Sequence, residues 1–198
     1  MDRNLGATSA TPGDVGALGL LYQWGRKDPF LGSSSISSSV QALSTGTWET
    51  SSTQITNALA ISNPTTFFTG LDNYLPNDNW QSKKTAYDPC PAGWRVPDGG
   101  ENGIWKNAGF AYTPYDYTNS GISFSITSPD TTWYPASGYL HFGDGVLGNC
   151  GNDGLYWSVT PSSDYYNHAY YFSFYYDGVG PTNTYFRSNG YSVRCLQE

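Results

Sequence analysis

The side chains best suited to chemistry lie toward the C-terminal end of the chain. Asp164 and Asp177 could be posed as the two carboxylates of a glycosidase. His168 lies between them, but no serine or cysteine motif marks a nucleophile for it to activate. Nothing in the sequence indicates a raised carboxyl pKa or a fixed geometry for the acidic pair. We therefore expect no catalytic residue, and we interpret His168 as a contact residue.

Oxygen-bearing side chains also gather in a glycine-rich stretch at Asp144, Asn149, Asn152 and Asp153. Calcium prefers such ligands, but their spacing is not that of an EF-hand loop. The alternative is that these are turn residues whose side chains hydrogen-bond their own backbone. We favour that alternative, and we expect no metal site and no cofactor.

Tyrosine is the residue in surplus. The chain of 198 residues has 17 tyrosines, and nine of them lie between Tyr156 and Tyr191. Their neighbours are mainly Ser, Asn, Asp and Gly, whereas ordinary exposed surface is rich in Lys and Glu. Tyrosine gives a large contact area at low entropic cost, and Ser, Asn and Gly give adaptable hydrogen bonds. The composition indicates a binding surface, with a tyrosine-rich β-core as the alternative.

The predicted ligand-binding residues lie within a region of about 157–190. They are Ser162, Ser163, Asp164, Tyr165, Tyr166, Asn167, His168, Tyr171, Ser173, Tyr175, Tyr176, Asp177, Thr182, Asn183 and Tyr185.

The three cysteines leave two interpretations open. Cys90, Cys150 and Cys195 have neither the spacing nor the histidine partners of a structural zinc site. One disulfide with one remaining thiol is the simplest count, and three buried thiols are the alternative. A bridge between Cys90 and Cys195 would close a loop of about a hundred residues and contribute up to ~4 kcal/mol.

Length and charge narrow the class of protein. The length suits one domain over residues 1–198, and the net charge of −7 argues against a nucleic-acid partner, because phosphate binding needs clustered cations. No segment reaches the length of about 18 apolar residues that a membrane-spanning helix needs. No basic region precedes an apolar one at the start. We expect a segment of a longer exported protein.

The elements that must position the tyrosines are mostly short strands. Alternating or aromatic runs bounded by turn residues predict strands within 122–126, 133–134, 139–142, 156–159, 169–176 and 191–195. The best helix signal runs from Asp98, as a cap, to Gly109. The Ser-rich stretch at about 32–56 reads as a surface insertion. The sequence thus predicts an α+β fold with short helices, a small antiparallel sheet and long loops.

The residues of the predicted strand from Ala169 to Tyr176 alternate between two faces of different character. Tyr170, Phe172 and Phe174 share one face and resemble core residues. Tyr171, Ser173 and Tyr175 share the other face. We expect this second face to point outward, as an aromatic and polar binding site.

Two motifs resemble a known family. The segment Asp88-Pro89-Cys90-Pro91-Ala92-Gly93-Trp94-Arg95-Val96-Pro97 and the terminal Gly190-Tyr191-Ser192-Val193-Arg194-Cys195 are similar to those of the Fibrobacter succinogenes major paralogous domain. That family has C-type-lectin-like folds. The resemblance covers most of the chain and implies that fold and a disulfide between Cys90 and Cys195. Val159 departs from the family's usual serine after Trp157-Ser158.

The C-terminal region also resembles the variable region of proteins diversified by a retroelement, which often use this fold. Adenine-directed mutagenesis of Asn-type codons yields mostly Asn, Tyr, Ser, Asp, His, Thr, Gly and Phe, the types that dominate 162–168, 171–177 and 182–186. The resemblance implies a non-catalytic domain that binds a protein or glycan ligand, extracellular or on a cell surface, or on a phage particle. A fixed-specificity surface adhesin or fimbrial-tip module is the alternative.

Overall fold

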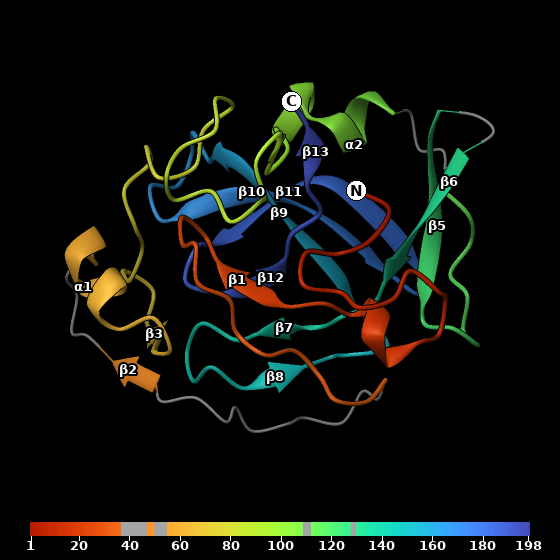
Figure 1. Ribbon diagram of the computed structural model, residues 1–198, viewed down its shortest axis with the longest axis horizontal. Coiled ribbons are helices and arrows are strands. Elements are labelled where there is room, and N and C mark those ends of the chain that lie inside the picture. Colours follow the sequence, from red (N-terminus) through yellow and green to blue (C-terminus); the bar gives the residue numbers. More distant parts are fainter. Residues whose placement is uncertain (37–46, 50–54, 109–111, 128–129) are drawn as a thin grey trace.

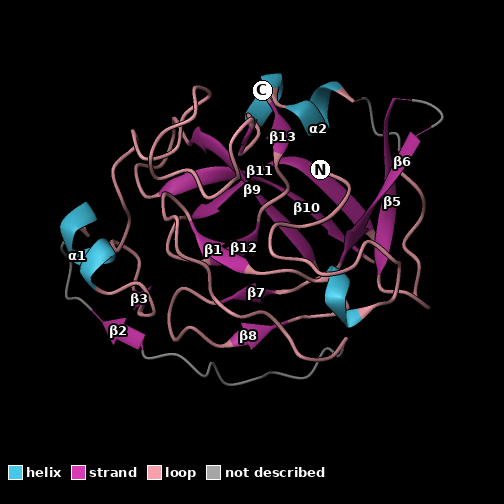
Figure 2. Cartoon of the chain, viewed as in Figure 1, coloured by secondary structure: helices cyan, strands magenta, loops and turns pink. Residues whose placement is uncertain are grey.

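The computed structural model describes residues 1–36, 47–49, 55–108, 112–127 and 130–198. Strands and long loops dominate, and the helices are short (Figure 2). The expectation of a loop-rich chain with short helices is confirmed, although sheet clearly outweighs helix. Most of the Ser-rich stretch at 32–56 lies outside the described residues.

The described helical segments and strands have the following bounds. The helical segments are η1 Val15–Ala17, α1 Asn57–Ser62, η2 Gly100–Asn102 and α2 Ile104–Asn107. The strands are β1 Leu21–Gln23, β2 Thr47–Glu49, β3 Phe67–Thr69, β4 Trp94–Arg95, β5 Gly121–Thr127, β6 Asp130–Pro135, β7 Tyr139–Leu140, β8 Leu147–Gly148, β9 Gly154–Pro161, β10 His168–Tyr175, β11 Gly178–Phe186, β12 Gly190–Ser192 and β13 Leu196–Gln197.

The largest sheet has seven strands, in the order β11-β10-β9-β12-β7-β8, with β1 also paired to β12. Its long strands β9, β10 and β11 pair antiparallel, as expected. The β9–β12 pair is parallel, so this sheet is mixed, and it is larger than the small antiparallel sheet that the sequence predicts. A parallel pair needs a crossover, and here the chain leaves β9, forms the β10–β11 hairpin and returns on the other side of β9.

Smaller elements flank this sheet (Figure 1). The β5–β6 hairpin lies at one side of the molecule, and α1 lies with the parallel β2–β3 pair at the other. Thr56 caps α1 by accepting a hydrogen bond from the Leu59 backbone N–H. Strands β4 and β13 pair near the C-terminal end of the described chain.

Both faces of the central strands are buried. On one face Trp157 packs with Tyr171 and Tyr191 in a cluster that also includes residues of β1 and the disulfide. On the other face Phe172 and Phe174 pack with residues of α2 and the β5–β6 hairpin. A strand buried on both sides loses the alternation of apolar and polar residues.

Three arginines are buried rather than displayed. The guanidinium of Arg187 lies 4.5 Å from the Trp24 ring centre, and that of Arg194 lies 4.2 Å from the Tyr134 ring. Arg26 lies over Phe30 at 4.9 Å. Burial lowers the pKa of Arg26 and of Arg187 to about 10, so both remain charged near neutral pH. Because these cations are used inside, the surface is more acidic than the net charge alone suggests.

The helix predicted from Asp98 differs from the structure. Instead of capping a helix, the Asp98 carboxylate accepts a hydrogen bond from Arg95 at 2.7 Å and another from the Ser82 hydroxyl. The segment is divided into η2 and α2 by Gly103, whose φ of −72° and ψ of 158° are extended rather than helical. Gly109, the expected helix end, lies outside the described residues.

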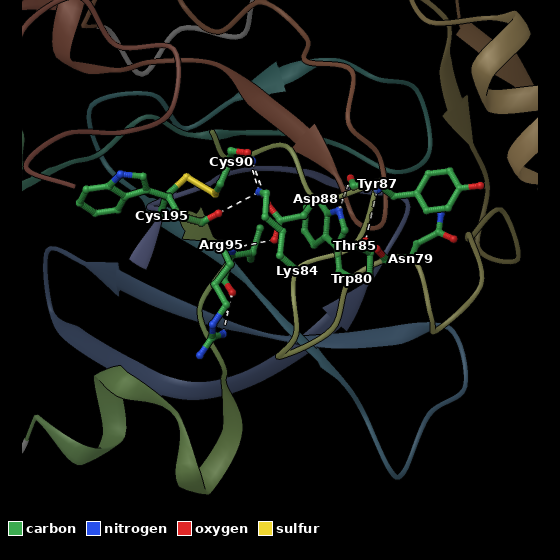
Figure 3. Close-up of polar contacts among 11 residues, drawn as sticks. Asn79, Trp80, Lys84, Thr85, Tyr87, Asp88, Cys90, Arg95 and Cys195 are labelled. Carbon is green, nitrogen blue, oxygen red and sulfur yellow. Dashed lines mark hydrogen bonds and ion pairs between the residues drawn. A yellow bond between two sulfur atoms is a disulfide. The ribbon is translucent and has the colours of Figure 1, made fainter. Parts of the chain in front are cut away.

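The disulfide between Cys90 and Cys195 is confirmed, with a Cα–Cα distance of 5.9 Å (Figure 3). Lys84 supports the Cys90 loop through hydrogen bonds from its Nζ to the Asp88 carboxylate and to the Cys90 and Trp94 carbonyls. Cys150 is buried, and its thiol lies 3.5 Å from the Ser35 carbonyl oxygen.

Among the described residues, no helix is long and apolar enough to cross a bilayer.

Replacing Cys90 and Cys195 together by alanine is expected to lower the free energy of unfolding by about 3–5 kcal/mol, because the bridge closes a long loop. Urea unfolding of the oxidised protein and of the double variant measures this. Reductant should destabilise the native protein by a similar amount and leave the double variant unchanged. Equal stability of the oxidised, reduced and double-variant proteins would contradict the structural role of the bridge.

Candidate ligand-binding face

The predicted site residues lie on three connected segments around strand β10. The first is the loop 162–167 between β9 and β10, the second is β10 with the turn at Tyr176 and Asp177, and the third is β11. The register places Tyr171 opposite Asn183 and Ala169 opposite Tyr185. Antiparallel pairing therefore brings the second and third segments side by side.

Most of the predicted residues are accessible. The exposed ones are Ser163, Asp164, Tyr165, Tyr166, Tyr176, Asp177, Asn183 and Tyr185. The half-buried ones are Ser162, Asn167, His168, Tyr175 and Thr182. Tyr165, Tyr166 and Tyr176 are 58%, 66% and 62% exposed, which is unusual for side chains of this size.

The expectation that Tyr171 and Ser173 point outward is wrong. Tyr171 is 7% exposed and Ser173 is fully buried. The Tyr171 ring packs against Tyr191, with ring centres 5.1 Å apart, in the buried cluster that also holds Trp157 and the disulfide. The Ser173 hydroxyl accepts a hydrogen bond from the Asn183 side chain at 2.9 Å. The face that resembled a binding surface in the sequence is therefore largely a second core face.

A cavity of about 240 Å³ nevertheless opens on this side of the sheet. Five neighbouring strands or their ends contribute to its walls. Its lining residues are Tyr139, His141, Asp153, Leu155, Tyr171, Tyr175, Tyr185 and Tyr191. Three of these tyrosines, at 171, 175 and 185, were predicted as ligand-binding residues, and the structure brings them together here.

Burial controls the ionisation of the groups in the cavity. It raises the pKa of the Tyr171 and Tyr191 hydroxyls far above the ordinary range, so both stay neutral hydrogen-bonding groups. Burial also raises the pKa of the Asp153 carboxyl, and the nearby negative charge of Asp177 acts in the same direction. A hydrogen bond from the Asn149 amide at 2.7 Å partly offsets this effect on Asp153.

A row of aromatic rings extends the face beyond the cavity. His168 lies between Tyr165 and Tyr185, with ring-centre distances of 4.8 and 5.9 Å. Desolvation and the charge of Arg187 lower the His168 pKa. Tyr166 lies beyond this row, where its hydroxyl donates to the Asp72 carboxylate at 2.9 Å.

A second hollow of about 190 Å³ lies at the β10–β11 turn. Tyr175 borders both hollows, while Tyr176 and Asp177 line only the second. Tyr165 and Tyr166 are therefore exposed at one end of β10, and Tyr176 is exposed at the other.

Several site residues were missed from the sequence. Tyr139, His141, Asp153, Leu155 and Tyr191 line the cavity from β7, β9, β12 and the loops beside them. The sequence shows which of these residues share a face of their own strand. It does not show that they line one cavity, because that depends on the parallel β9–β12 pairing and on the pairing of β7 with β12. Local periodicity carries no information about such long-range neighbours.

The acidic pair considered for glycosidase chemistry is not brought together. Asp164 lies in the loop before β10 and Asp177 lies in the turn after it. Eight strand residues at about 3.3 Å each separate these ends by roughly 20 Å or more. Glycosidase carboxylates are about 5–9.5 Å apart, so these two cannot act as such a pair.

The oxygen-rich stretch at 144–153 behaves as turns. The Asp144 carboxylate accepts from the Val146 backbone N–H at 3.0 Å, and Asn149 bonds Asp153. Within the described residues, no group of three His, Cys, Asp or Glu side chains could hold a metal ion.

Comparisons with known proteins give one match. A family described as a domain of unknown function (DUF8237) matches residues 117–196. The matched region contains β7 to β12 and therefore the whole candidate face, but it is less than half of the chain. No curated protein and no solved structure matches the chain.

Truncation of two tyrosines on the same strand and turn tests their different placement. Tyr171→Ala is expected to lower the free energy of unfolding by about 3–5 kcal/mol, because it empties a buried aromatic position. Tyr176→Ala, the matched control, is expected to change it by less than about 0.5 kcal/mol. Denaturant unfolding measures both, and equal losses would show that the two side chains are not separated into core and surface.

Proposed function

We propose that this chain is a non-catalytic ligand-binding domain that binds a protein or glycan partner through the candidate face. This face is the surface formed by the loop 162–167, by β10 with its turn, and by β11. The observation that carries the proposal is the exposure of Tyr165, Tyr166 and Tyr176, each more than half accessible at the ends of the well-packed strand β10. Large aromatic rings held on a rigid frame lose little entropy on binding and bury much area. Exposed aromatic patches of this kind mark interaction sites.

We further propose a C-type-lectin-like fold for the domain. The Cys90–Cys195 bridge, which the motif resemblance implies, is present. The strands and short helices arranged around it are compatible with that fold. A disulfide of this kind also supports an extracellular or cell-surface location, because such bonds persist in oxidising compartments.

The proposal includes diversification of the face by a retroelement. The residues that we assign to the frame are mostly core: Trp157, Ala169, Phe172, Phe174, Arg187 and Val193 are all at most 1% exposed, whereas Pro181 is half-buried. The residues of mutable types between them are mostly exposed or half-buried. This division between frame and face supports a variable protein over a fixed adhesin. Tyr171 and Ser173, both buried, depart from it.

Binding to arrays of immobilised proteins and glycans tests the proposed function. The triple variant Tyr165→Ala, Tyr166→Ala, Tyr176→Ala is expected to lose at least about tenfold in affinity for whatever ligand the native domain binds, because the aromatic anchors are gone. Its melting temperature should be unchanged.

Ile61→Ala on α1, where Ile61 is 63% exposed, is the matched control and should bind as the native domain does. Full binding by the triple variant, or its unfolding, would contradict a displayed tyrosine face.

The DNA around the gene tests diversification separately. We expect a nearby near-copy of the segment that encodes Trp157 to Cys195, differing at adenines and lying beside a reverse transcriptase gene. Sequencing of the locus decides this. Absence of both elements would favour the fixed-specificity adhesin.

A further inference from the structure

The cavity on the candidate face is lined mainly by aromatic rings. Five of its eight lining residues are tyrosines, and their rings stand at steep angles to one another. The Tyr139 and Tyr191 rings are nearly perpendicular, at 88°, and the Tyr171 and Tyr191 rings meet at 55°. Rings that surround a space attract a cation through their electron-rich faces.

The charge of the cavity also favours a cation. Asp153 contributes a carboxylate, and neither lysine nor arginine is among the lining residues. Among the ion pairs of the described residues, none involves Asp153. Arg187, a buried cation beside His168, is held against Trp24 and donates to the His168 carbonyl. A bound cation would give Asp153 a charged partner in addition to the Asn149 amide.

The volume of the cavity and the hydrogen bonding of Asp153 restrict which chemical group can bind there. At about 240 Å³ the cavity is smaller than the roughly 300–1,000 Å³ typical of whole small-molecule sites. It suits one side chain of a larger partner. One Asp153 oxygen already accepts from Asn149, which leaves fewer acceptor positions for the two-pronged pairing that a guanidinium prefers. An ammonium group needs only a point contact, and Leu155 with the rings can cover an alkyl stem.

We propose that this cavity binds an alkylammonium group, and that the partner supplies it as a lysine side chain on a protein surface. The inference rests on the proposed function, because it names the chemistry that the candidate face recognises. The glycan alternative would present an amino sugar, whose hydroxyl groups would have to be desolvated together with its amine.

The test is titration of the full chain, followed by NMR and calorimetry, with Nα-acetyl-lysine methylamide and its neutral counterpart Nα-acetyl-norleucine methylamide. We expect saturable binding of the lysine probe, with shifts at Tyr139, Leu155 and Tyr191, and binding of the norleucine probe at least about tenfold weaker. The arginine counterpart and glucosamine should also bind several-fold more weakly. Equal binding of the lysine and norleucine probes, or no binding of either, overturns the proposal. Tighter binding of glucosamine overturns the choice of a protein partner.

Two variants with the same charge change locate the site. Asp153→Asn is expected to weaken lysine-probe binding about tenfold, whereas Asp78→Asn, an exposed aspartate outside both the cavity and the candidate face, should change it less than about twofold. In the native protein the Asp153 carboxyl should also titrate at a lower pH when the probe is bound. This readout does not depend on a variant that folds. An unchanged Asp153 titration, or equal losses in both variants, overturns the assignment.

Failure of this inference can be separated from failure of the proposed function. Tyr165, Tyr166 and Tyr176 do not line the cavity. If their triple variant loses partner binding and the native protein does not bind the lysine probe, the proposed function stands and the lysine site is rejected.

Discussion

Trp157 lies nearly parallel to Tyr191, with ring centres 4.1 Å apart, and both side chains are almost wholly buried. This contact joins β9 to β12, and the indole N–H of Trp157 also donates to the Tyr22 carbonyl of β1. Because Phe172 and Phe174 fill the opposite side of the neighbouring strand, the sheet is packed on both faces. Its edges, its turns, the loop 162–167 and the cavity beside β10 remain to meet a partner.

That packing determines what kind of recognition the domain can perform. A sheet buried on both sides holds its turns and edge strand in place, so the exposed tyrosines bind from a preorganised position. The buried arginines stack on aromatic rings inside the frame and leave the face without an accessible cation of its own. The cavity on this face is therefore lined by aromatic and acidic groups, and this lining is why we propose a cationic ligand.

The strands and the disulfide could be predicted from the sequence, but the burial of the tyrosines could not. Alternation and turn residues located β5, β9 and β10, and the motif resemblance implied the Cys90–Cys195 pair. Tyr171 was misplaced because alternation cannot reveal that a second layer covers the other face. Thr56 marks the start of α1, yet the short helix was missed. The cavity depends on long-range pairing of β12 with β7 and β9, which no local pattern records.

Hydroxyl-radical footprinting of the domain, alone and bound to a ligand found on the arrays, tests the central claim most directly. The exposed tyrosines should be oxidised readily in the free domain. The account predicts that ligand protects Tyr165, Tyr166 and Tyr176 while half-buried Trp94, on β4, keeps its rate. Protection of Trp94 with unchanged oxidation of the three tyrosines would contradict the account, because the ligand would then bind elsewhere.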